Sequence, residues 1–246
     1  MTVGPPLKLI FSFSMPLLLG NLFQQLYNTV DSIIVGNFVG KYALAGVSAG
    51  FPFIMMLVSF FIGIGIASTI MISQAFGAKD FDKVHIISST IYKSLLISVI
   101  PVSIIGIITT RPILILMNVP DDGTLALCVT YLHVIFFGLI GMVGFNLNAG
   151  ILQGVGDSVT SVKYLIIAAL INIVFDLIFV IPMQMGVFGA ALATVISQFV
   201  SWILGILHIN KHYHYLRVDF KDMPFDKEVF KRSLKLGIPS ALQNSV

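Results

Sequence analysis

The stretch NLFQQLYNTVDSIIVG, residues 21–36, shows what kind of protein this is, because it is apolar overall yet carries several amides and one acid. The apolar run around it, from Leu9 to Gly36, exceeds the roughly 20 residues that a helix needs to cross about 30 Å of hydrocarbon. Its regularly spaced polar residues are Asn21, Gln24, Asn28 and Asp31. Spacings of three and four residues place them on one face of a helix, so the stretch predicts a membrane-spanning helix with one polar face.

That polar face is not expected to contact lipid. For Asn21 and Gln24, which lie nearer the middle of the membrane, two roles stay open: hydrogen bonding to a neighbouring helix, or lining a polar cavity. Cavity lining is the role that we predict for Asn28, and it is one of the two open roles of Asn21 and Gln24.

The composition of the chain extends this interpretation to all 246 residues, of which 57% are hydrophobic and 10% are charged. Water-soluble domains normally carry about 25% charged residues. The predicted spans are Leu9–Gly36, Ala43–Ala75, Ile86–Thr109, Thr124–Leu152, Ser161–Ile181 and Gly186–Leu207, and a seventh begins near Leu234. The predicted fold is an all-α polytopic membrane protein, with a six-transmembrane-helix lobe plus the start of a seventh helix.

The basic residues follow membrane topology rather than forming a surface for nucleic acid. With a cytoplasmic N-terminus, the outer loops carry only Lys41 and Arg111. The inner segments carry Lys8, Lys79, Lys83, Lys163, Lys211, Arg217, Lys221, Lys227, Lys231 and Arg232. This asymmetry predicts a multi-pass protein of the plasma membrane with its N-terminus in the cytoplasm, in contact with the lipid bilayer and with no nucleic-acid partner.

A polar stretch divides the chain into three predicted parts: a six-helix lobe at 1–208, a cytoplasmic linker with an interfacial amphipathic helix at 209–233, and the start of a second lobe at 234–246. FSMPLLLGN, which contains Pro16, aligns with LGIPSALQN, which contains Pro239. A parallel repeat of this kind predicts that the chain is the first half of a transporter and that the C-terminal lobe is missing.

Two acids carry the functional signal, because only Asp31 and Asp176 of the eleven Asp and Glu residues fall within predicted spans. An acid there costs at least about 2.5–3.5 kcal/mol, so it usually faces a polar interior or a water-filled cavity. The alternative is a protonated carboxyl that hydrogen-bonds a neighbouring helix. Each acid lies about 7–8 Å below the outer end of its span, and this shared depth predicts that the two meet.

Two neutral residues join the acids at a similar depth. Asn172 precedes Asp176 by four residues and shares its helical face, and Thr194 lies about 12 Å below the outer start of its span. Such oxygen ligands suit a hard cation such as Na⁺, whereas two buried neighbouring carboxyls can equally bind H⁺. We expect no cofactor besides this coupling ion and no other metal, and the lone cysteine, Cys128, excludes an intrachain disulfide.

The chain resembles the N-terminal half of the multidrug and toxic compound extrusion (MATE) transporters over nearly its whole length. The resemblance is carried by VDSIIVGNFVGKYALAGVS, SQAFGAKDFDKV, LQGVGDSVTS, NIVFD and GVFGAALATVISQ. It implies two six-helix lobes around a central cleft, and export of amphipathic, often cationic compounds in exchange for Na⁺ or H⁺.

Residue by residue, the resemblance implies a cation site at Asp31, Asn172, Asp176 and Thr194. Tyr131 is similar to a tyrosine associated with that site in the family. The alternative for Tyr131 is an aromatic side chain at the outer membrane interface.

Three other functions compete with this prediction. The GVGD motif at 154–157 is similar to that of intramembrane aspartyl proteases, but Asp157 lies about 28 Å from Asp176 on one helix, too far for a catalytic dyad, so we expect no enzyme. A lipid-linked saccharide flippase of the wider superfamily more often lines its cavity with basic residues, whereas no Arg lies deep in a span here. A non-transporting membrane fragment, or a half-transporter that dimerises, is the third. We predict half of a cation-coupled antiporter.

Overall fold

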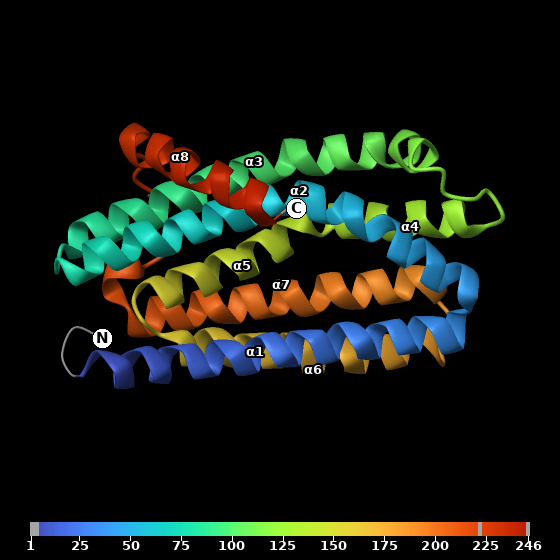
Figure 1. Cartoon of the computed structure of the whole chain (residues 1–246), viewed down its shortest axis with the longest axis horizontal. Coiled ribbons are helices and arrows are strands. Elements are labelled where there is room, and N and C mark those ends of the chain that lie inside the picture. The colour runs from blue at the N-terminus through green and yellow to red at the C-terminus, as the bar shows by residue number, and fades with distance from the viewer. Residues whose placement is uncertain (1–4, 221–222, 245–246) are drawn as a thin grey trace.

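The computed structural model describes residues 5–220 and 223–244, and this part of the chain is almost entirely helical and contains no strand. The long helices run side by side along the longest axis of the molecule (Figure 1). Of the residues and ranges used in the predictions above, residues 1–4, 221–222 and 245–246 lie outside the described residues, and Lys221 is among them. The all-α prediction is confirmed.

The bundle contains eight α-helices in the described part of the chain, together with one π-helical and one 3₁₀ segment. They are α1 (Pro6–Ile34), η1 (Val35–Val39, π-helical), α2 (Lys41–Gly77), α3 (Phe81–Leu116), α4 (Thr124–Phe137), α5 (Leu139–Gly154), α6 (Ser158–Val180), α7 (Gly186–His212), η2 (His214–Leu216, 3₁₀) and α8 (Lys227–Asn244).

By length and composition, five segments of the described chain could each cross a membrane, or six if α4 and α5 count as one bent span. These two helices meet at a bend of 55°, so the predicted span Thr124–Leu152 consists of two helices and is one span only if the bent pair is counted together. The break lies at Gly138, where an added Cβ would stand 2.3 Å from the methyl groups of Val195 on α7. Glycine at this corner lets α7 approach the backbone closely.

The third predicted span, Ile86–Thr109, is too short, because α3 continues to Leu116. Thr109 and Thr110 lie inside the helix, where their hydroxyls donate to the carbonyl oxygens of Ile105 and Gly106. Polar residues near a helix end therefore did not mark the end itself.

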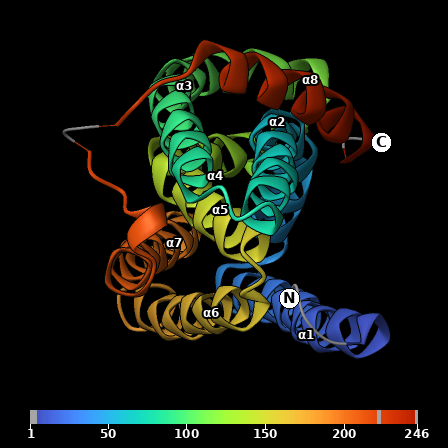
Figure 2. The ribbon, with the colours of Figure 1, turned by 90° about the vertical axis from the view of Figure 1, so that its left-hand side faces the viewer.

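The interfacial helix and the start of the seventh span form one continuous helix, α8. The carboxylate of Asp226 starts it by accepting from the backbone N–H groups of Glu228 and Val229. α8 lies across α2 and α3 (Figure 2), and Gly63 of α2 meets Gly237 of α8 so closely that a Cβ on Gly63 would stand 2.3 Å from the Gly237 carbonyl oxygen. The division into lobe, linker and second lobe stays a prediction.

The apolar core lies among α2, α3, α4, α5 and α7, where Phe136, Leu139 and Ile151 are fully buried. In the end-on view, α1 and α6 lie together on one side of the bundle and α7 lies beside α6 (Figure 2). The predicted cation-binding residues lie on α1, α6 and α7.

Candidate functional site

The predicted site residues converge where α1, α6 and α7 approach one another, in the half of the bundle nearer the turn between α1 and α2. Asn172 and Asp176 on α6 are completely buried, while Asp31 on α1 and Thr194 on α7 are half-buried. Gly20 brings α1 close to α6, since a Cβ there would stand 3.0 Å from Val162. The structure thus brings all four residues together.

Asn172 links Asp176 to Thr194. Its amide nitrogen lies 2.8 Å from Asp176 Oδ2 and donates to it, and its amide oxygen accepts from the Thr194 hydroxyl at 3.3 Å. This orientation of the amide is assigned from the hydrogen-bond network, because it turns a donor toward the carboxylate. The Thr194 hydroxyl also lies 3.2 Å from the carbonyl oxygen of Ala190.

The two carboxyl groups, one from α1 and one from α6, face each other. Asp31 and Asp176 are within hydrogen-bonding distance, and each keeps one buried oxygen, Oδ1, without a hydrogen-bond partner in the protein. A buried acceptor that lacks a donor costs about 1–3 kcal/mol, and more when it is charged. Two adjacent carboxyls with free lone pairs can offset that cost by binding one cation or by sharing a proton.

Two tyrosines border the carboxyl pair. Tyr131 on α4 is 9% exposed and lies near Asp31, so it is a neighbour of the carboxyl pair in the bundle. Tyr27 on α1, which sequence reasoning missed, lies near Asp31 and Thr194. The signal that could have found it is its spacing, because Tyr27 precedes Asp31 by four residues and so shares its helical face.

The predicted cavity-lining residues do line cavities next to the carboxyl pair. A cavity of about 500 Å³ is bordered by the amides of α1 together with Tyr131, Thr194 and Gln198. The amides concerned are those of Asn21, Gln24, Gln25 and Asn28. In the part of the chain that the structure describes, Asn21 and Gln24 form no hydrogen bond to another helix, and neither Lys nor Arg borders this cavity.

Gln198 is a second residue that sequence reasoning missed. Its amide oxygen is buried without a partner, and it follows Thr194 by four residues, on the same face of α7. Asp157, by contrast, is remote from the site: it precedes α6, caps it by accepting from the N–H of Thr160 at 2.9 Å, and accepts from the Tyr213 hydroxyl at 2.6 Å. No dyad with Asp176 exists.

Comparison with known proteins gives consistent results. The MatE family model matches residues 16–178. A probable multidrug resistance protein, YoeA of Bacillus subtilis (strain 168), is 33% identical, and the match covers 94% of this chain and 51% of YoeA. Multidrug export protein MepA of Staphylococcus aureus (strain MRSA252) is 25% identical, with 98% of this chain and 53% of MepA covered.

Solved structures agree with these sequence matches. A crystal structure of MATE in complex with MaL6 superposes with a TM-score of 0.90 at 28% identity, covering 99% of this chain and 54% of that chain. The outward-facing conformation of a multidrug resistance MATE family transporter of the MOP superfamily gives a TM-score of 0.86 at 28% identity, with 99% and 54% covered. The chain spans about half the length of the curated relatives that it matches.

Proposed function

The chain belongs to the MATE family of multi-pass membrane transporters, and from this premise we propose that it provides the ion-binding lobe of a cation-coupled antiporter. The complete transporter exports amphipathic, often cationic drugs or toxic compounds in exchange for Na⁺ or H⁺. It lies in the plasma membrane with its N-terminus in the cytoplasm, and a second lobe completes the central cleft.

The observation that carries this proposal is the facing pair Asp31 and Asp176, with one partnerless buried oxygen on each. In the proposed site these carboxyls bind the cation, Asn172 and Thr194 are neutral ligands, and Tyr131 is a neighbour. The absence of Lys and Arg from the border of the adjoining cavity favours cationic cargo over the anionic cargo of a saccharide flippase. Asn21, Gln24 and Asn28 offer this cargo hydrogen bonds.

Asn172 lets the site accept either ion without losing its hydrogen bonds. When Asp176 is ionised, the amide nitrogen donates to it. When Asp176 is protonated, the amide can turn over, so that its oxygen accepts from the carboxyl and its nitrogen donates to Thr194 at 3.3 Å. Loading drives transport only if the ion binds the two conformations of the transporter with different affinity.

Replacing Asp176 by Asn in the full-length transporter tests the proposal. Asp176→Asn should abolish export driven by Na⁺ or H⁺ gradients, imposed separately across proteoliposomes, because the side chain can no longer carry the countercharge. Asp157→Asn makes the same chemical change at an acid remote from the site, at the start of α6, and should leave export nearly unchanged. Full gradient-driven export by Asp176→Asn would refute the assignment.

A further inference from the structure

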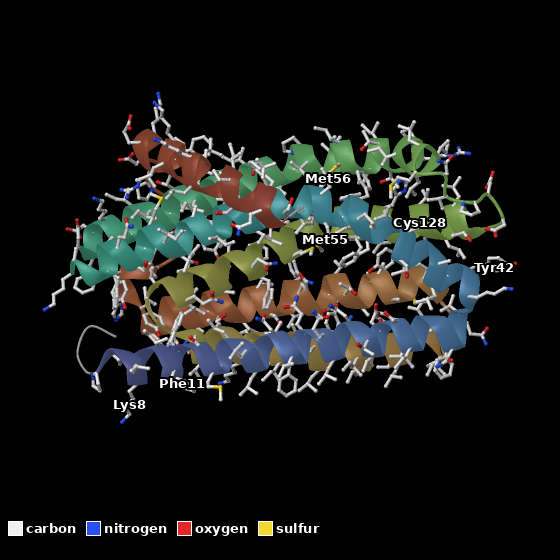
Figure 3. All side chains as sticks on the ribbon, in the orientation of Figure 1. Lys8, Phe11, Tyr42, Met55, Met56 and Cys128 are labelled. Carbon is white, nitrogen blue, oxygen red and sulfur yellow. The ribbon has the colours of Figure 1, made fainter. Side chains whose placement is uncertain are left out.

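The cavity beside the carboxyl pair continues into a second one. This inner cavity, of about 220 Å³, shares Asn21, Gln24 and Gln198 with the first and extends to Gln153 and Ser161, where α5 turns into α6. Met55, labelled in Figure 3, lines both. Because they share these residues, we treat the two cavities as one passage along α1 that contains several amides.

The inner cavity follows the first part of α6. The α6 residues that border it run from Ser161 to Ala169, eight positions or about 12 Å, and Asp176 lies beyond them. Figure 3 shows side chains with oxygen and nitrogen atoms in the space between α1 and α7. The passage therefore begins at Thr194, which Asn172 links to Asp176, and ends near the start of α6.

The inner cavity has an apolar lining interrupted by amides and hydroxyls, and none of its polar groups carries a formal charge. No Asp, Glu, Lys or Arg side chain borders this cavity. Gln198 does border it, and its side-chain oxygen is buried without a hydrogen-bond partner. Amide and hydroxyl oxygens are ligands for hard cations and for water. Because they are uncharged, they hold a cation weakly, which suits a place that an ion passes through.

A hydrogen bond lies at the α5–α6 end of the passage. The Gln153 amide nitrogen donates to the Ser161 hydroxyl at 3.1 Å and joins the end of α5 to the beginning of α6. Ser161 is only 5% exposed. On the other side of this cavity, Gly20 of α1 lies against Val162 and Leu165, so the helices are in close contact there.

We propose that the monovalent cation held by Asp31 and Asp176 enters or leaves the lobe along this amide-lined passage, and that the Gln153–Ser161 hydrogen bond is the gate at its α5–α6 end. The inference rests on the proposed function. It adds a route for the ion and gives a role to Gln153 and Ser161, which are not ligands in the proposed cation site.

Thiol accessibility in sealed membrane vesicles tests the gate. Cys128→Ala first removes the lone, buried cysteine, and Gln198→Cys then places a thiol in the passage. The reagent is a small cationic methanethiosulfonate that does not cross membranes, applied to vesicles of either orientation. Gln153→Ala or Ser161→Ala should each speed modification about tenfold from the α5–α6 side only, because one ordinary hydrogen bond no longer holds the gate closed.

Two controls separate opening of the gate from damage to a helix. Ile203→Cys places a thiol on the same helix, at a side chain that is 41% exposed and borders neither cavity, and its slow reaction should not respond to the gate variants. The double variant Gln153→Ala with Ser161→Ala should be no faster than either single variant, since both remove the same bond. An unchanged rate in both single variants, or an equal response at position 203, overturns the gate.

Ion protection distinguishes failure of the gate from failure of the cation site. Adding Na⁺, or lowering the pH in its absence, should slow modification at position 198 if that ion occupies the passage, and Asp176→Asn should remove the slowing. If Asp176→Asn removes it while the gate variants have no effect, the passage is wrong and the cation site stands. If the gate variants act while Asp176→Asn leaves the slowing intact, the passage stands and the cation site is wrong.

Discussion

Two buried polar clusters in this bundle differ in how far their hydrogen bonds are satisfied. In the first, the satisfied group is the Asn148 amide on α5: its oxygen accepts from the Tyr92 hydroxyl on α3, and its nitrogen donates to the Trp202 carbonyl oxygen on α7 at 2.9 Å. The Trp202 indole N–H beside it is buried without a partner. In the second, Asp31 and Asp176 face each other with one partnerless oxygen on each.

The first cluster holds helices together, whereas the second has oxygen atoms free to bind a ligand. A neutral amide whose donor and acceptor are both used fixes the packing of three helices at a low cost of burial. A pair of carboxyls with unused oxygens lowers stability, and such groups concentrate at functional sites. The comparison therefore predicts opposite responses to mutation.

The largest effect is expected in the satisfied cluster. Asn148→Ala should lower the free energy of unfolding by about 2–4 kcal/mol, because it opens a cavity and leaves the buried Tyr92 hydroxyl without its acceptor. Asp176→Asn should cost little or even stabilise, since it keeps the shape of the side chain and removes repulsion between carboxyls. Reversible unfolding in detergent micelles measures both; equal destabilisation by the two changes would make the carboxyl pair merely structural.

The sequence predicts the carboxyl pair better than the satisfied cluster, for a physical reason. An acid inside an apolar run is costly wherever it points, so Asp31 and Asp176 stand out, and helical rise places them at one depth. An amide such as Asn148 is tolerated in many surroundings. Its partners come from helices that lie 56 residues earlier and 54 residues later in the chain, and no local pattern indicates them.

The bend between α4 and α5 shows the same limit. The residues from Thr124 to Leu152 form one apolar run, and hydropathy cannot separate a straight span from a bent one. What decides the geometry is the contact of Gly138, Gly141 and Gly144 with side chains of α7. Tyr27 and Gln198 differ from these glycines, because their spacing from Asp31 and Thr194 was visible in the sequence and could have been used.

A smaller effect is expected from the glycines that let α5 approach α7 next to the satisfied cluster. An added Cβ at Gly144 would stand 2.3 Å from the Trp202 ring, so Gly144→Ala should cost about 1–3 kcal/mol in the same unfolding assay. Gly65 on α2 is the matched control, because a Cβ there meets nothing within 4 Å. Gly65→Ala should be neutral or stabilise by about 0.5–1 kcal/mol. If both changes cost the same, close packing at Trp202 is not what Gly144 provides.

The smallest effect is expected at Asp157, an acid whose partners are all within the protein and which therefore resembles the satisfied cluster. Burial raises the pKa of its carboxyl, but hydrogen bonds from the Tyr213 hydroxyl and from Thr160 outweigh it, so the pKa is lowered from its usual value. Because the folded pKa is the lower one, the stabilisation is present above the unfolded pKa of about 4, and is lost as the pH falls through the folded value.

Tyr213→Phe removes the hydroxyl donor and should cost about 0.5–1 kcal/mol near neutral pH, an amount kept small by the partial exposure of the group. The difference from the wild type should shrink below about pH 4, where the carboxyl of the wild type also loses its charge. Tyr215→Phe is the control, because the Tyr215 ring packs on Phe81 and no hydrogen bond joins it to Asp157 in the described structure. If the difference in free energy of unfolding between Tyr213→Phe and the wild type stays constant from pH 7 to about pH 3, Tyr213 does not stabilise the Asp157 carboxylate. Asp157 would then not belong with the satisfied groups.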